Sequence, residues 1–389
     1  MSILERPLRM PLPLRNRTQR RMSCGPYLIV FGTLALALMF AAPVGAQDGT
    51  LEGVETSFTR WMRENGVARA TLAIAHGDRL VLVRGYGGLR GERRVLIASL
   101  TKPITSVCTA MLIQQDKLRF DSTLGEWLPK RYGRPRDPRL LKVTVAQLLT
   151  HRAGFSRRED DPATGSALWK VLQSHGAGQG TMHDLVPSVL RARLDFAPGA
   201  TYIYTNASYL LLGVIIEAVT GESYEHACNA AVLAPHGIGG ATLDTTWAVL
   251  GSFGGWSLSA PEYLAFLRTF APSRTLLDPE THRWMLSAAG KETTASGSMF
   301  YSLIRVSPAS AGGYDFQHTG SFAYRWPDKR VDENGGNLAV SAHFGASWVV
   351  HYEPWSSRAA AALARETYQA IQGVTVWPQL DLYPSLNLH

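Results

Sequence analysis

Strand-like segments lie towards both ends of the 389-residue chain, and a long helical stretch separates them. The early strand-like runs, at 71–75 and 80–86, flank a His-Gly-Asp-Arg turn. The late runs are at 297–306, 314–320, 337–344 and 346–352. Early and late strands that share one sheet leave the middle of the chain as an insertion. We therefore predict an α+β (α/β-type) sandwich: a mostly antiparallel sheet, flanked by helices, with an inserted all-helical subdomain.

The same pattern sets the expected domain boundaries. One domain is predicted over residues 47–375. Its sheet part takes residues from about 50–120 and 290–375, and its helical insert takes about 121–289. Residues 376–389 are expected to form a C-terminal tail.

Residues 1–46 have the composition of a targeting segment. They carry six arginines and one acid, followed by a 16-residue apolar run over Tyr27–Ala42. Such a run is short for a bilayer span and fits a secretory signal, although an N-terminal membrane anchor over 27–42 is the open alternative. Met10 is an alternative start. Either interpretation predicts that the rest of the chain is periplasmic or secreted.

Charge and cysteine content narrow the function classes. Of the net charge of +8, the first 46 residues supply +5, so +3 remains for the rest of the chain, which contains no dense Lys/Arg run. A nucleic-acid partner is therefore not expected. Cys108 and Cys228 fall on apolar helix-like stretches, and we expect buried free thiols rather than a disulfide. No metal-ligand or cofactor motif is present, so neither is expected.

Ser99 and Lys102 form a Ser-x-x-Lys sequence where an apolar strand ends and a helix begins. Residues three apart share a helix face, so the lysine amine can reach the serine hydroxyl. A lysine partly withdrawn from water loses its preference for the charged form and can accept or relay the serine proton. The pattern indicates a nucleophilic serine. The alternative is an N-cap serine followed by a solvated lysine.

Two later elements carry further candidates. Tyr204-Thr205-Asn206 follows a Phe-Ala-Pro-Gly turn and precedes an apolar helix. A tyrosine on such a loop can act as acid or base near cations, and an asparagine amide can orient a lysine or a substrate amide. His318-Thr319-Gly320-Ser321 follows a strand-like run, where glycine permits close approach of a substrate backbone. His343, in a second His-x-Gly sequence, is predicted to be structural.

Ser-x-x-Lys, Tyr-x-Asn and His-Thr-Gly, in this order, resemble the active-site triplet of class C β-lactamases and related penicillin-recognising serine hydrolases. Three connecting segments are also similar to those of the family: QLLTHRAG at 147–154, FAPGATYIYTN at 196–206 and GGWSLS at 254–259. The similarity extends from about 53 to 372. It implies a β-lactamase/transpeptidase-like fold and catalysis through an acyl-enzyme.

The resemblance also implies a role for each candidate. Ser99 is the nucleophile and Lys102 assists its deprotonation. Tyr204 passes the proton to the leaving group and then activates the deacylating water. Asn206 orients the substrate and Lys102. His318 stands where class C β-lactamases have a lysine, and holds Tyr204 or a substrate carboxylate.

The remaining implied roles concern the oxyanion hole, the departures from the family and the substrate. The backbone N–H groups of Ser99 and Ser321, after Gly320, form the oxyanion hole. His151 is interpreted as fixing its loop.

The histidine at 318 weakens a β-lactam-resistance function, but a β-lactam, a D-Ala-D-Ala peptide and an ester all fit the same core. Specificity is expected to lie in 152–181, predicted to be an exposed loop, and in 321–334.

The alternative to an exported serine hydrolase is a non-catalytic protein that keeps the fold for cell-wall binding or assembly. A small-molecule or peptide substrate is the expected partner, with contact to a membrane only through the N-terminal segment. The sequence leaves the oligomeric state open.

Overall fold

The computed structural model describes residues 49–156, 160–176, 178–270, 275–287, 299–301, 304–308, 314–325 and 332–389. The predicted signal or anchor at 1–46 lies outside these residues. Within the described ranges, no helix is both long enough and apolar enough to cross a membrane.

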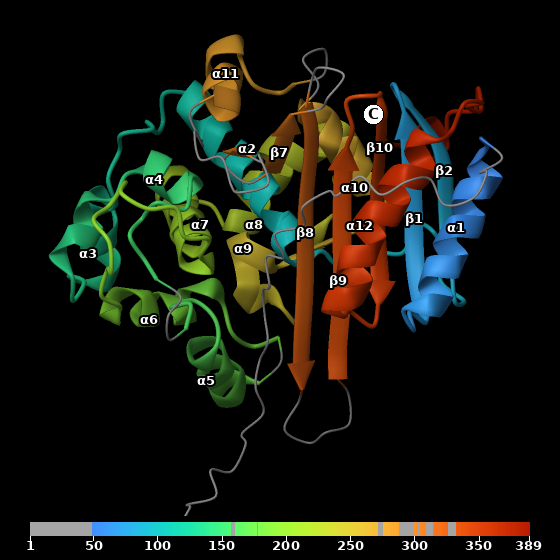
Figure 1. Ribbon diagram of the computed structural model, residues 1–389. Helices are drawn as coiled ribbons and strands as arrows, with labels where there is room; N and C mark the ends of the chain where they lie inside the picture. The colour runs from blue at the N-terminus through green and yellow to red at the C-terminus, as the bar shows by residue number, and fades with distance from the viewer. Residues whose placement is uncertain are drawn as a thin grey trace, which may run out of the picture.

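A seven-stranded sheet forms the centre of the molecule, and every neighbouring pair in it is antiparallel (Figure 1). The strand order is β2-β1-β10-β9-β8-β7-β6, so the first strand of the chain pairs with the last, and early and late strands share one sheet, as predicted. The strands are β1 (Arg69–His76), β2 (Arg79–Tyr86), β6 (Met299–Tyr301), β7 (Ile304–Pro308), β8 (Tyr314–Arg325), β9 (Asp332–Ser341) and β10 (Ala346–Glu353).

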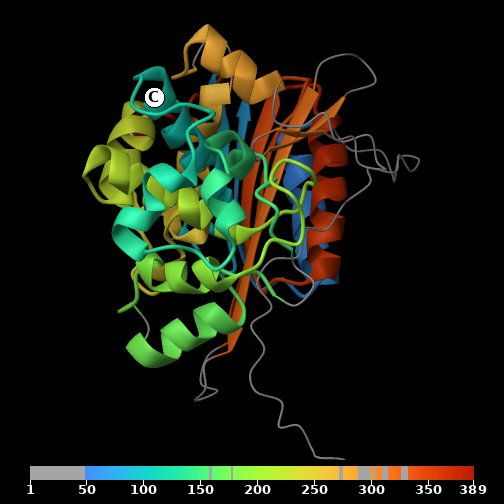
Figure 2. The same cartoon turned by 90° about the vertical axis from the view of Figure 1, so that its left-hand side faces the viewer.

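Helices α1 (Leu51–Glu64) and α12 (Ser357–Gln372) cover one face of this sheet, and the helical part of the chain covers the other (Figures 1 and 2). Because side chains alternate along a strand, each strand serves both cores. In β10, Trp348 packs with α1 and α12, whereas Val349 belongs to the core on the opposite face. The sheet is therefore covered on both faces, which explains why β1 is buried along nearly its whole length.

The insert contains most of the remaining helices, and α2 leads into it from the sheet part. These helices are α2 (Thr101–Gln114), α3 (Leu128–Tyr132), α4 (Val145–Leu149), α5 (Ser166–His175), α6 (Val186–Arg191), α7 (Asn206–Thr220), α8 (Tyr224–Cys228), α9 (Gly251–Gly254), α10 (Ala260–Leu267) and α11 (Pro279–Ser287). A second, small sheet joins β3 (Val95–Leu96), β5 (Trp256–Leu258) and β4 (Thr242–Leu243). The sequence prediction placed the end of an apolar strand before Ser99, where β3 lies, but it did not include the short strands β4 and β5 within the insert.

The prediction of an exposed loop over 152–181 is wrong. Helix α5 lies within it and buries Leu168, Val171 and Leu172 against the insert. The helix has only ten residues, and polar and glycine residues surround its three buried apolar positions. The apolar periodicity is therefore too short to be recognised in the sequence.

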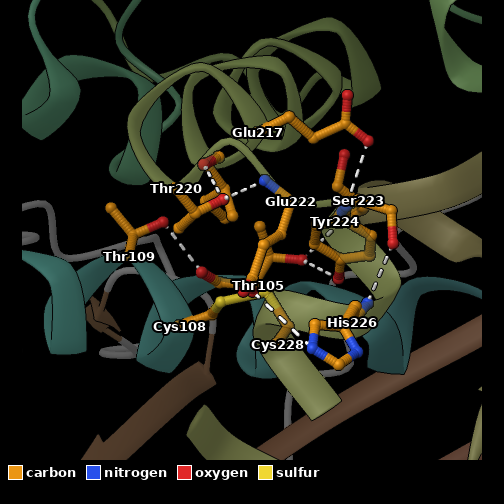
Figure 3. The surroundings of a disulfide bond; sticks show 12 residues. Thr105, Cys108, Thr109, Glu217, Thr220, Glu222, Ser223, Tyr224, His226 and Cys228 are labelled. Carbon is orange, nitrogen blue, oxygen red and sulfur yellow. Dashed lines mark hydrogen bonds and ion pairs between the residues drawn. A yellow bond between two sulfur atoms is a disulfide. The ribbon is translucent and has the colours of Figure 1, made fainter. Parts of the chain in front are cut away.

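The prediction of free thiols is also wrong, because Cys108 and Cys228 form a disulfide with a Cα–Cα distance of 5.3 Å (Figure 3). The bond ties α2, which begins at the Ser99 turn, to the end of α8. The Thr105 hydroxyl hydrogen-bonds to the Tyr224 hydroxyl between the same helices, at 2.7 Å. Sequence periodicity identified both cysteines as buried, but it cannot show that positions 120 residues apart are neighbours.

Replacing both cysteines by alanine is expected to lower the free energy of unfolding by about 3–5 kcal/mol, because the bond closes a loop of more than a hundred residues in the unfolded chain. Urea denaturation of the oxidised protein and the Cys108→Ala/Cys228→Ala variant measures this. Equal unfolding midpoints for the two proteins, with and without reductant, would contradict the prediction.

Candidate active site

Ser99 lies in a tight turn between the small sheet and α2. The turn, η1 (Ala98–Leu100), follows β3 after one linking residue, Ile97, and places Ser99, which is 3% exposed, at the start of the helix. Ala98 adopts a φ of 48°, a left-handed conformation that is costly for a residue with a Cβ atom. The Leu100 carbonyl accepts a hydrogen bond from the Tyr263 hydroxyl at 2.9 Å. The packing therefore holds a strained turn directly before the candidate nucleophile.

The Lys102 amine lies against the Ser99 hydroxyl. Its Nζ is 2.9 Å from Ser99 Oγ and 2.8 Å from the carbonyl oxygen of Phe253, and the side chain is fully buried. Because Phe253 O can only accept, it directs the amine towards the serine. A solvated lysine after an N-cap serine is therefore not what the structure contains: the N-cap residue of α2 is Leu100 rather than Ser99, and the Lys102 side chain is fully buried.

Tyr204 approaches the same amine from the loop before α7. Its ring centroid is 4.9 Å from Lys102 Nζ, and only 7% of the residue is exposed. The His151 ring packs on the Tyr204 ring with a centroid distance of 4.4 Å. The loop therefore brings the tyrosine ring against the lysine amine that contacts Ser99, so the three residues form one buried group.

Asn206 is the first residue of α7, and its side-chain amide is completely buried. Neither Oδ1 nor Nδ2 has a hydrogen-bond partner among the described residues. A buried amide without partners is costly and is normally satisfied by a ligand or water. The amide is therefore available to a bound substrate.

Strand β8 passes directly beside the Ser99 turn. A Cβ atom on Gly320 would lie 2.5 Å from the carbonyl oxygen of Ile97 and 3.0 Å from the backbone nitrogen of Ser99. Only glycine permits this approach. Ser321 follows on the strand, paired with Gly336 of β9 and 8% exposed.

His318, two residues before Gly320, contacts the turn through its ring. Its Nε2 is 3.0 Å from the carbonyl oxygen of Ser99, so Nε2 carries the proton and donates it, which leaves Nδ1 as an acceptor. Burial and the nearby Lys102 ammonium lower the pKa of His318 from 6.5 to about 3, although its bond to Ser99 acts in the opposite direction. The ring is therefore neutral at physiological pH, unlike a lysine at this position.

The structure brings all three predicted motifs to one place. Sequence reasoning missed two groups there: the Phe253 carbonyl, which accepts from Lys102, and the Asp161 carboxylate, which accepts from the backbone nitrogen of Asn206 at 2.6 Å. Phe253 directly precedes the family-like segment at 254–259, and this position could have drawn attention to it. Asp161 lies in the segment predicted to be an exposed loop, and its sequence neighbours give no signal.

A groove of about 620 Å³ lies beside this part of β8. The residues that line it include Phe322, Trp247, Gly335 and Arg93. Phe322 lies two residues after Gly320 and therefore on the same face of the strand. The described residues contain no cluster of three or more His, Cys, Asp or Glu side chains placed to hold a metal.

Comparison with known families agrees with this geometry: a family model described as Beta-lactamase matches residues 54–323. The chain belongs to the β-lactamase family. The match begins in α1 and ends within β8, just after Ser321, so it includes every predicted site residue of this β-lactamase-family protein.

Relatives that match parts of the chain carry names that indicate different functions. The chain is 32% identical over 142 residues to the probable fimbrial assembly protein FimD, serogroup H1, of Dichelobacter nodosus, covering 36% of this chain and 33% of that protein. It is 30% identical over 198 residues to esterase EstB of Burkholderia gladioli, covering 48% of this chain and 49% of the esterase. These matches span a third to a half of the relatives' own lengths.

A solved structure extends the similarity to the whole fold. The D-stereospecific amidohydrolase from Streptomyces sp. superimposes with a TM-score of 0.64 over 82% of this chain and 98% of that chain, at 21% sequence identity. At that identity the likeness concerns the fold alone. It supports the predicted β-lactamase/transpeptidase-like architecture.

Replacing Gly320 by alanine is expected to lower the free energy of unfolding by about 1–3 kcal/mol, since the new methyl group meets backbone atoms that must move. Thermal unfolding measures the loss. Gly239→Ala is the matched control, because a Cβ atom there would have no neighbour within 4 Å. Equal melting temperatures for the two variants would contradict the close approach of β8 to the Ser99 turn.

Proposed function

We propose that the chain is a serine hydrolase that cleaves an ester or amide through an acyl-enzyme on Ser99. The observation that carries this proposal is the fully buried Lys102 amine, 2.9 Å from Ser99 Oγ. A binding surface gains little from burying a lysine beside a serine, because withdrawing the ammonium from water is costly. The cost of burying Lys102 beside Ser99 is explained if the lysine accepts the serine proton during catalysis.

The proposed steps follow from the positions of the groups. Ser99 Oγ attacks the substrate carbonyl carbon while its proton passes to the Lys102–Tyr204 pair. The carbonyl oxygen becomes an oxyanion between the backbone N–H groups of Ser99 and Ser321, each such donor being worth a few kcal/mol. The carbon–leaving group bond then breaks as Tyr204 returns the proton to the leaving group. Water, deprotonated by the same pair, releases the acid and restores Ser99.

The state of His318 favours substrates without a carboxylate beside the scissile bond. The ring is neutral and its Nε2–H is already donated to the Ser99 carbonyl, so His318 offers no fixed positive charge to a substrate. Moving a neutral ester or amide from water into the buried site costs less desolvation free energy than moving a carboxylate, which must lose its hydration shell. We therefore place simple esters and amides ahead of β-lactams.

A second candidate is an assembly role without catalysis, which the name of the Dichelobacter relative, a probable fimbrial assembly protein, favours. This role would make Ser99 and Lys102 dispensable. The two candidates therefore differ in a property that substitution at Ser99 measures directly.

Wild-type protein is expected to react with a fluorescent fluorophosphonate and to hydrolyse a p-nitrophenyl acyl ester faster than nitrocefin or a D-Ala-D-Ala peptide. Ser99→Ala abolishes both labelling and turnover. Lys102→Met, which keeps the side-chain length without the amine, lowers turnover by at least about 10³-fold, as expected when a nucleophile loses its base.

Lys117→Met is the matched control, since Lys117 is an exposed lysine beyond the end of α2. It is expected to keep wild-type rates. Absence of labelling and of turnover on all three substrates would favour the assembly role. A nitrocefin rate above the ester rate would overturn the proposed substrate order.

We also propose that the chain is exported. The Cys108–Cys228 disulfide supports this, because structural disulfides persist mainly in oxidising compartments, and the leader-like composition of residues 1–46 agrees with it. Alkaline phosphatase fused after residue 60 is expected to be active in a Gram-negative host, whereas a fusion that lacks residues 1–46 is inactive. Equal activity of both fusions would contradict export.

A further inference from the structure

The loop that carries Tyr204 and Asn206 is held by two residues from another part of the insert. His151 binds it twice: its carbonyl accepts from Ile203 N at 2.9 Å, and its Nδ1 accepts from Thr205 N at 3.2 Å. Because Nδ1 is the acceptor, the proton of the neutral ring lies on Nε2. The loop is therefore tied at the residues on both sides of Tyr204.

Asp161 binds the next two residues of the same segment, Asn206 and Ala207. Its Oδ2 accepts from Asn206 N at 2.6 Å, and its Oδ1 accepts from Ala207 N at 3.3 Å and from Ala163 N at 3.0 Å. The residue is only 4% exposed. A buried carboxylate that accepts several backbone N–H bonds is well satisfied and rigidly placed.

This contact replaces an ordinary helix cap. The N-cap residue of α7, Thr205, makes no side-chain capping bond, and its hydroxyl instead bonds to the Ser208 hydroxyl at 2.9 Å. The first N–H groups of a helix need acceptors, and a negative charge at that end is favourable. Asp161 supplies both from 45 residues away in the sequence.

We propose that Asp161 is a positioning residue that fixes the Asn206 amide towards the substrate, with His151 holding the preceding Tyr204. The inference rests on the proposed hydrolase function. Asn206 has a buried amide with no hydrogen-bond partner among the described residues, so its direction depends on the backbone that carries it. That backbone is anchored at the Asn206 nitrogen itself by Asp161. A shift of about 1 Å at such a position can cost about a hundredfold in rate.

The test is a double-mutant cycle between Asp161 and Asn206, followed by steady-state hydrolysis of the p-nitrophenyl ester. Asp161→Ala is expected to lower kcat/KM about 10- to 100-fold in the wild-type background and less than about 3-fold in the Asn206→Ala background, because the second variant has no amide left to position. Asp161→Asn keeps one acceptor oxygen and is expected to give an intermediate loss. This conservative variant keeps the test valid where the alanine variant does not fold.

Asp278→Ala is the matched control. Asp278 accepts from Glu280 N and Thr281 N at the start of α11, and therefore caps a helix in the same way. Among the described residues it bonds to neither Ser99 nor Asn206. It is expected to lower the unfolding midpoint and leave kcat/KM unchanged.

Two results would overturn the positioning role: equal losses for the Asp161 variants in both backgrounds, or an unchanged kcat/KM with a lower unfolding midpoint only. Failure of the hydrolase proposal is distinguishable from either result. In that case wild-type protein shows no Ser99-dependent turnover, whatever stands at position 161.

Discussion

The contact between strand β8 and the Ser99 turn is the constraint on which the rest of the structure depends. At Gly320 the strand lies so close to the turn that a single methyl group would strike the Ile97 carbonyl, and His318 bonds to the Ser99 carbonyl from the same strand. This contact joins the central sheet to the start of α2, which carries Lys102. Tyr204 comes from the helical insert and packs against the Lys102 amine. The relative positions of Ser99, Lys102 and Tyr204 are therefore set where the sheet, α2 and the insert meet.

Much of this arrangement follows from local sequence patterns. The strands predicted at 71–75 and 80–86 are observed as β1 and β2. Both segments are rich in apolar residues, so their burial follows from the local sequence. The three motifs were also identified from their own residues and neighbours: Ser99 at the end of an apolar strand, Tyr204 after a Phe-Ala-Pro-Gly turn and His318 in a strand-like run.

The features that the sequence did not reveal depend on contacts between distant segments. Cys108 and Cys228 are both apolar-helix positions, and nothing local distinguishes a buried thiol from a disulfide half. In the sequence, nothing distinguishes Asp161 from the acidic residues beside it. Only the folded structure shows that it accepts a hydrogen bond at the start of α7. Helix α5 has too few apolar positions to stand out, although it buries Leu168 and Leu172. In each case tertiary packing, rather than local propensity, decides the outcome.

The proposed hydrolase function requires that Ser99 becomes covalently acylated. Mass spectrometry of the protein, after incubation with an activated ester and acid quenching, detects such an acyl-enzyme. We expect an added mass equal to the acyl group, located by peptide fragmentation on Ser99 and absent from Ser99→Ala. An acyl group on another residue, or ester turnover that persists in Ser99→Ala, would contradict it.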